Sequence, residues 1–248
     1  MVKGLDTFQK YFADYEEQYV LIGGAACDIL FESNEVNFRA TRDLDMVLII
    51  EALTPEFGEK FWKFIVDGKY RNKATNGRNP QFYRFDKPED DNFPKMIELF
   101  CRSDFKLKNA KGITPIHIDD EVSSLSAILL NDDYYKALLN GKEVRNGLSV
   151  LRPEYLILFK AKAYLDLKMR KDLGEKVDSN DVKKHKKDIL RIASELLLEK
   201  VEELPIAVDA DIHSFIDLLE QEPFDQNSLK RYGLKNEDVV EVLKQVFG

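Results

Sequence analysis

The chain has 248 residues, 44% hydrophobic and 33% charged, which is the composition of an ordinary globular protein with length for a large core. No apolar run approaches the roughly 20 residues of a membrane span, and the N-terminus lacks the apolar segment of a secretory signal. The net charge of −8 argues against a DNA-coating protein. We therefore expect a cytoplasmic protein without a membrane partner, in which Cys27 and Cys101 are reduced.

The N-terminal segment predicts a helix, a strand and a second helix. Apolar residues three or four apart favour a helix over 5–17, and 19–22 is a short strand candidate. Gly23-Gly24 follows, and 25–31 has helical composition. A glycine pair between strand and helix lets the backbone approach an anionic ligand closely, but an isolated pair is more often a plain tight turn.

Two aspartates open the next apolar run, Asp43-Leu44-Asp45 followed by residues 46–50. Strand side chains alternate with a period of two, so both carboxylates point to the same side. Two like charges at the mouth of a buried strand are costly unless a cation lies between them. The pair therefore indicates a cation site.

The middle of the chain predicts a helix and a hairpin. Thr54 and Pro55 form a helix start, and the segments 81–86 and 95–101 resemble paired strands. Glu98 is a lone carboxylate in the second strand, either a site residue or an edge residue facing water. A further strand over 113–118 and a helix over 122–130 follow.

The C-terminal part is expected to be all helical, with helices over 153–170, 181–199, 209–220 and 236–246. A mixed α/β part followed by helices places the boundary at Leu151, with domains 1–151 and 152–248. The fold class is therefore α/β (α+β), a mixed sheet flanked by helices and followed by an all-helical C-terminal domain.

The predicted helices over 153–170 and 181–199 carry the basic residues. Residues 152–200 hold 13 Lys/Arg against 9 Asp/Glu, whereas 201–248 hold 4 against 11. Lys160 falls within an apolar stripe, where a lysine must snorkel or meet a partner. The four lysines around His185, at 183, 184, 186 and 187, either solvate a helix face or face phosphates. Asp188 lies at the edge of the stripe. His185 is interpreted as a core residue, or as one that supports a site residue, in preference to a catalyst.

Several chemistries lack their motifs. The chain has no EF-hand spacing, no zinc-ligand spacing, and no GxSxG, P-loop or GxGxxG sequence. A glycosidase pair of Asp43 and Glu98 is conceivable, but neighbouring aspartates on one strand fit a metal better. Phosphoryl or nucleotidyl transfer fits best, because paired Mg²⁺ ions held by carboxylates stabilise the attacking and leaving oxygens.

The segments LIGGAACDIL and RATRDLDMVL, followed by FKAKAY and KHKKDILRI, resemble the AbiEii/AbiGii-type nucleotidyltransferase toxins. This family belongs to the DNA polymerase β-like nucleotidyltransferase superfamily, so the resemblance implies a nucleotidyltransferase-like fold. The similarity covers roughly 19–50 and 154–192, with Glu98 between them. The chain departs from the superfamily pattern in having Gly24 where a serine is common.

The resemblance also implies roles for individual residues. Asp43, Asp45 and Glu98 would bind two Mg²⁺ ions, with Glu98 alternatively the base for the attacking hydroxyl. The phosphates of the nucleoside triphosphate (NTP) would lie on the turn Gly23-Gly24. The remaining assignments are Lys160 as the nucleotide-contacting lysine, Asp188 as the downstream acidic residue, and Arg39 and Thr41 on the nucleotide side.

The predicted reaction is Mg²⁺-dependent transfer of a nucleoside monophosphate from an NTP, ATP or GTP among them, to an RNA or tRNA end or a protein hydroxyl. The resemblance implies the toxin of an abortive-infection pair with a cognate antitoxin. Two alternatives stay open. One is an antibiotic-modifying nucleotidyltransferase with the same carboxylates, and the other is an inactive protein that binds a nucleotide or a partner.

Overall fold

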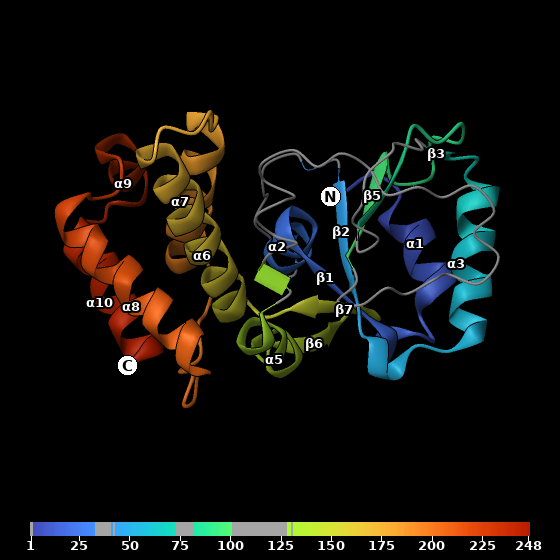
Figure 1. Ribbon diagram of the computed structural model, residues 1–248, viewed down its shortest axis with the longest axis horizontal. Coiled ribbons are helices and arrows are strands. Elements are labelled where there is room, and N and C mark those ends of the chain that lie inside the picture. Colours follow the sequence, from blue (N-terminus) through green and yellow to red (C-terminus); the bar gives the residue numbers. More distant parts are fainter. Residues whose placement is uncertain (1, 33–40, 42, 73–81, 101–127, 130) are drawn as a thin grey trace. The chain divides into compact units, whose positions relative to one another are not determined.

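The computed structural model describes residues 2–32, 41, 43–72, 82–100, 128–129 and 131–248 of the chain. It divides into two compact units, and Figure 1 labels their elements. The sheet unit comprises the elements up to residue 100 together with Lys142–Leu151. The helical unit comprises helix α5 and Arg152–Gly248. Within the described ranges, no helix is both long enough and apolar enough to cross a membrane.

The sheet unit is built on a mixed sheet with seven strands among the described residues, in the order β3-β4-β5-β2-β1-β7-β6. Strands β2 and β5 are parallel, as are β1 and β7, and the other neighbours are antiparallel. The strands are β1 (Tyr19–Ile22), β2 (Asp43–Leu48), β3 (Arg71–Asn72), β4 (Phe82–Asp86), β5 (Met96–Phe100), β6 (Lys142–Arg145) and β7 (Leu148–Leu151). The predicted α/β class is therefore confirmed, as is the β4–β5 hairpin.

Helices cover both faces of this sheet (Figure 1): α1 (Leu5–Phe12) and α3 (Pro55–Asp67) lie on one face and α2 (Gly23–Glu32) on the other. Aromatic rings fill the α1/α3 face. Phe8 of α1 lies edge-on to Tyr19 of β1, and Phe61 of α3 lies edge-on to Phe85 of β4. All four side chains are buried, so this face is the hydrophobic core of the unit.

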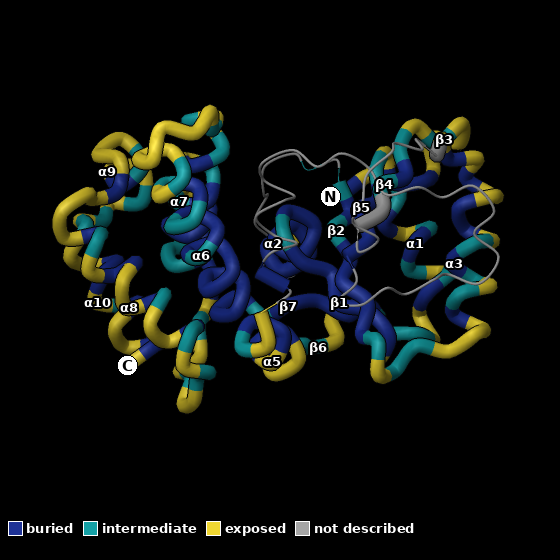
Figure 2. Tube along the Cα trace, in the orientation of Figure 1, coloured by how far each residue is buried: buried dark blue, intermediate teal, exposed yellow. Residues whose placement is uncertain are grey.

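The helical unit consists of α5 (Asp132–Asn140), α6 (Pro153–Asp172), α7 (Ser179–Glu195), α8 (Ile206–Gln221), α9 (Gln226–Tyr232) and α10 (Asn236–Phe247). Helix α6 packs against α5, α7 and α8 and is buried along most of its first four turns (Figure 2). Pro153 opens this helix in its first turn, as predicted. The all-helical character of the C-terminal part is confirmed.

Several boundaries differ from the predictions. The first helix ends at Phe12 rather than 17, and a 3-10 turn over Glu16–Gln18 leads into β1. Helix α2 starts at Gly23, so the glycine pair forms its first two residues instead of a separate turn. Helix α7 ends at Glu195 because Leu196 is already extended. The predicted strand over 113–118 lies outside the described residues, as does most of the predicted helix over 122–130.

Helices α5 and α9 and the hairpin β6–β7 are absent from the prediction. The hairpin turns at Asn146 and Gly147, whose φ angles are +52° and +69°. Positive φ at both central residues is the geometry of the tight two-residue turn that Asn-Gly favours. The dipeptide was therefore the overlooked signal for the hairpin.

For α5 the overlooked signal was Asn131, whose side chain accepts hydrogen bonds from the amides of Asp133 and Tyr134.

Candidate functional site

The carboxylates of the sheet unit share one face of the sheet. Asp45 of β2 is the register partner of Glu98 of β5, and Glu98 is the partner of Arg84 of β4. Residues in register point to the same side of a sheet, and neighbours along a strand point to opposite sides. Since Phe85 faces α1 and α3, the side chains of Arg84, Glu98, Asp45 and Asp43 lie on the face that α2 covers.

Glu98 is in contact with both Arg84 and Asp45. The Nε atom of Arg84 donates a 2.8 Å hydrogen bond to Oε1 of Glu98, and the Nη2 atom is 2.5 Å from the same oxygen. The Asp45 carboxyl also hydrogen-bonds to Glu98, and the charge of Asp43 acts on Glu98. Glu98 thus lies beside Asp45 and within the field of Asp43, and it does not face water at an edge.

Burial makes ionisation of Glu98 costly. The side chain is only 8% exposed, and this loss of water raises the pKa of its carboxyl above the usual range. The negative charge of Asp43 works in the same direction, whereas Arg84 and the hydrogen bond from Asp45 work against it. A further positive charge beside the three carboxylates would therefore be stabilised by a field that Arg84 only partly neutralises.

Gly23 lies directly against this carboxylate cluster. Its φ angle is +64°, and a Cβ atom built on it would lie 2.0 Å from Oδ2 of Asp45. Only glycine fits there, because any side chain would overlap the carboxylate and be strained in the left-handed region. The start of α2 therefore approaches the Asp45 carboxylate as closely as a backbone can.

Thr41 lies against the other glycine. A Cβ atom at Gly24 would be 2.7 Å from Oγ1 of Thr41, and that oxygen is buried with no hydrogen-bond partner among the described residues. A buried hydroxyl of this kind is costly unless something else binds it. Gly23, Gly24 and Thr41 are thus brought together, as the prediction for the nucleotide side requires. Arg39, the remaining residue of that prediction, lies outside the described residues.

The carboxylate oxygens are suitable ligands for a divalent cation, but they are not already arranged around a metal site. Carboxylate oxygens are the ligands that Mg²⁺ prefers, and two or three of them are available here. Among the described residues, however, no three acidic, histidine or cysteine side chains already converge as metal ligands do. Both Arg84 contacts involve Oε1 of Glu98, so the guanidinium holds one of the oxygens that a metal would use.

The other two predicted site residues are paired inside the helical unit. The Nζ atom of Lys160 on α6 is 2.8 Å from Oδ2 of Asp188 on α7, and their side chains are 7% and 5% exposed. Lys160 therefore meets a partner instead of snorkelling to water. His185, one turn before Asp188 at the spacing of 3.6 residues, is buried as predicted.

Gly23 supplies a direct test of this geometry. Gly23→Ala is expected to lower the free energy of unfolding by about 1–3 kcal/mol, because the new methyl group collides with Asp45 and φ stays positive. Gly58→Ala is the matched control. Gly58 lies inside α3 with no atom within 4 Å of a built Cβ, so alanine should stabilise the helix by about 0.5–1 kcal/mol. Chemical denaturation of both variants measures the two values. An unchanged free energy of unfolding in Gly23→Ala would contradict the described contact between Gly23 and Asp45.

Sequence reasoning missed Arg84. Its segment, FYRFD, alternates as a half-buried strand does, so a basic residue there is unremarkable. The only available signal was its position opposite Glu98 in the predicted hairpin, which depends on the register.

Comparisons with known proteins add little. No protein-family model matches the chain, and no curated protein does, so membership of the AbiEii/AbiGii family is not shown. Among solved structures the chain is similar to an antigenic nucleotidyltransferase-like protein from Paracoccidioides brasiliensis. The sequences are 15% identical, the match covers 99% of this chain and 95% of that one, and the TM-score is 0.49. The function of this chain has to be inferred from its own side chains.

Proposed function

We propose that the chain is a Mg²⁺-dependent nucleotidyltransferase that moves a nucleoside monophosphate from an NTP to a hydroxyl group. The observation that supports this most is that Asp45 lies against both Glu98 and the glycine start of α2, with the charge of Asp43 acting on Glu98. Carboxylates can bind a metal ion, and the backbone amides at a helix start can bind a phosphate. The two together therefore suit a metal–phosphate ligand better than either group alone.

The proposed roles follow from position. Asp43 and Asp45 would hold the metal, and the second oxygen of Glu98 would complete the set. The backbone at Gly23 and Gly24 would approach the phosphates, and the hydroxyl of Thr41 would donate to a phosphate oxygen. When bound, Mg²⁺ would supply charge stabilisation at the attacking and leaving oxygens. Arg84 would hold the Glu98 carboxylate in place beside Asp45.

The test of the reaction is a transfer assay with the purified chain, Mg²⁺ and each labelled NTP in turn. RNA including tRNA, a protein mixture and an aminoglycoside serve as separate acceptors. Stoichiometric pyrophosphate release together with label on one acceptor class would support the proposal and identify the acceptor. Label on the aminoglycoside alone would favour the antibiotic-modifying alternative. NTP binding with no turnover on any acceptor would favour the inactive, nucleotide-binding alternative. A toxin role would further require that a cognate antitoxin suppress transfer.

Mg²⁺ itself is expected to stabilise the folded chain. At a concentration of about 100 times the dissociation constant, linkage predicts about 2.7 kcal/mol of added stability, because the unfolded chain lacks the site. Thermal denaturation with Mg²⁺ and with EDTA measures the shift. Asp45→Asn should remove it. An equal shift in Asp45→Asn and in the parent chain would place the ion elsewhere.

A further inference from the structure

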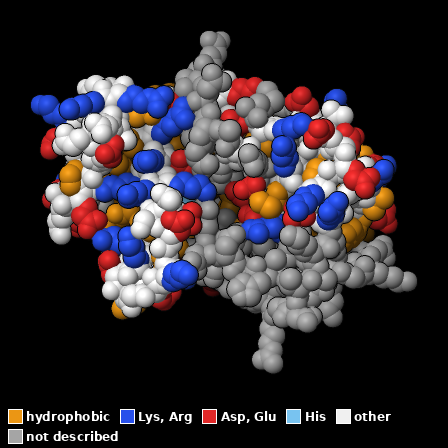
Figure 3. All heavy atoms as spheres, turned by 90° about the horizontal axis from the view of Figure 1, so that it is seen from above, with side chains coloured by type: hydrophobic (Ala, Val, Ile, Leu, Met, Phe, Trp, Pro, Cys, Tyr) orange, Lys and Arg blue, Asp and Glu red, His pale blue; other side chains and the backbone are white. Residues whose placement is uncertain are grey.

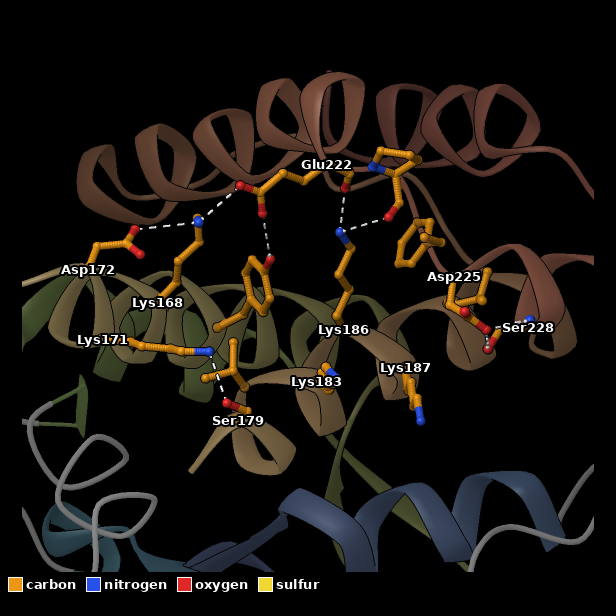
Figure 4. Close-up of a pocket in the computed structure, with 15 residues that line it drawn as sticks. Lys168, Lys171, Asp172, Ser179, Lys183, Lys186, Lys187, Glu222, Asp225 and Ser228 are labelled. Carbon is orange, nitrogen blue, oxygen red and sulfur yellow. Dashed lines mark hydrogen bonds and ion pairs between the residues drawn. The ribbon is translucent and has the colours of Figure 1, made fainter. Parts of the chain in front are cut away.

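The helical unit contains a pocket of about 540 Å³ whose lining includes none of the residues proposed for the transferase site. Figure 4 shows its walls, which come from α6, α7, the connection between α8 and α9, and α9 itself. Volumes of roughly 300–1,000 Å³ are typical of small-molecule sites, so this pocket has the size to hold one. Basic side chains also gather over the helical unit in Figure 3.

The pocket carries a surplus of positive charge. Five lysines line it against three acidic residues. Two of these acids are already engaged with a single lysine, since Lys168 contacts Asp172 at 3.4 Å and Glu222 at 3.0 Å. The third, Asp225, caps α9 by accepting hydrogen bonds from the amide and hydroxyl of Ser228.

The remaining lysines are available to a ligand. Lys183 and Lys187 are exposed on α7, and Lys171 donates a hydrogen bond to the Ser179 hydroxyl. Among the described residues, none of these three forms an ion pair with a carboxylate within 4.0 Å. Several ammonium groups around one cavity attract an anion carrying more than one charge, and a phosphate carries about −1.5 to −2 at neutral pH.

The inner wall of the pocket is apolar. Val182, Leu190 and Phe224 are 9%, 2% and 2% exposed. Lys186 lies half-buried at this wall, 5.6 Å from the Tyr164 ring centre and 5.5 Å from that of Phe224, and its Nζ donates to the Pro223 carbonyl at 3.2 Å. Desolvation lowers the pKa of its ammonium group. A bound anion would offset that cost.

We propose that this pocket binds a small organic phosphate of about mononucleotide size, with its phosphate at Lys171, Lys183 and Lys187 and its organic part at the apolar wall. The residues that line this pocket all belong to the helical unit, and none of them is a residue of the proposed transferase site. A nucleic-acid strand is disfavoured, because strand binding uses a continuous basic groove and residues 201–248 carry 11 acidic against 4 basic residues.

Lysine footprinting on the full chain in EDTA tests the proposal, with AMP, adenosine and inorganic phosphate as probes. At about ten times its dissociation constant AMP leaves about a tenth of the sites open, so acylation of Lys183 and Lys187 should slow about tenfold. Lys200, which lies outside the pocket and pairs with Glu202, should react unchanged. Adenosine should protect neither lysine, and phosphate should protect both more weakly than AMP does.

Charge reversal supplies the second measurement. Lys183→Glu with Lys187→Glu should weaken AMP binding about tenfold or more in equilibrium dialysis, whereas Lys200→Glu should not. Both lysines are exposed, so the variant should fold, which a thermal melt checks. AMP should protect Lys183 and Lys187 equally in the Asp45→Asn variant. This result would show that AMP binding here does not depend on the transferase site. No protection by AMP, equal protection of Lys200, or protection by a short RNA but not by AMP would overturn the proposal.

Discussion

Asp43→Asn is expected to reduce the rate of nucleotidyl transfer at least about 100-fold, because a neutral amide replaces one of the charges that hold Mg²⁺. The fold should be retained. Asp43 begins β2 and is only partly buried, so its replacement by an isosteric amide should change the free energy of unfolding by about 0.5 kcal/mol or less.

The rate should be measured at saturating Mg²⁺ and NTP, with pyrophosphate release as the readout. Asp91→Asn is the matched control. Asp91 is a carboxylate of the same unit that is 89% exposed and pairs with Lys3, so its loss should leave the rate unchanged. A folded Asp43→Asn variant with the parent rate would refute the metal-dependent mechanism.

Lys160→Met is expected to have the largest effect on stability, a loss of about 3–5 kcal/mol in the free energy of unfolding. The substitution removes the ammonium group 2.8 Å from the buried Asp188 carboxylate, and breaking a buried ion pair by removing one partner is strongly destabilising. Lys160→Met with Asp188→Leu should recover most of the loss, because an apolar pair removes both desolvation costs. Denaturant unfolding of the two single variants and the double variant gives the coupling energy.

The same variants separate structure from substrate binding. If Lys160 acts only through Asp188, the double variant should recover the parent KM for the NTP together with its stability. If Lys160 contacts the nucleotide, as the family resemblance implies, KM should stay raised in the stable double variant. Lys200→Met is the control, because its ion pair with Glu202 is exposed and should contribute at most about 1 kcal/mol. An unchanged stability of Lys160→Met would contradict the buried pair.

The sequence predicted those parts of the fold that depend on local pattern. The strand 19–22, the DLD strand, the β4–β5 hairpin and the helix starting at Pro153 follow from apolar periodicity and turn residues. The hairpin β6–β7 was missed because Lys142–Arg145 has no apolar alternation, although Asn146-Gly147 marks its turn. The start of α2 was placed too late because glycine has a low helix propensity. Its close approach to Asp45 is a tertiary feature that propensity does not contain.

The candidate site was predictable to the same extent. Asp43 and Asp45 follow from a period of two, whereas Glu98 was assigned to the site only through the family resemblance. The pairing of Lys160 with Asp188 and of Arg84 with Glu98 depends on which elements become neighbours in space. Spacing along the chain does not determine that. The stripe position of Lys160 indicated that its ammonium group needed a partner, but it did not identify that partner.

Neither unit is a continuous stretch of chain, and this has a consequence for synthesis. Helix α5 precedes β6 and β7 in the sequence but belongs to the helical unit, where Tyr134 lies against Phe159 of α6 and bonds to Asp211 of α8. On the ribosome the sheet unit has all its strands once Leu151 has emerged. Helix α5 cannot complete its packing until α8 has been synthesised, some 70 residues later. Until that point the part of α5 that packs against α8 is uncovered, and we expect a chaperone to bind a nascent chain of this protein there.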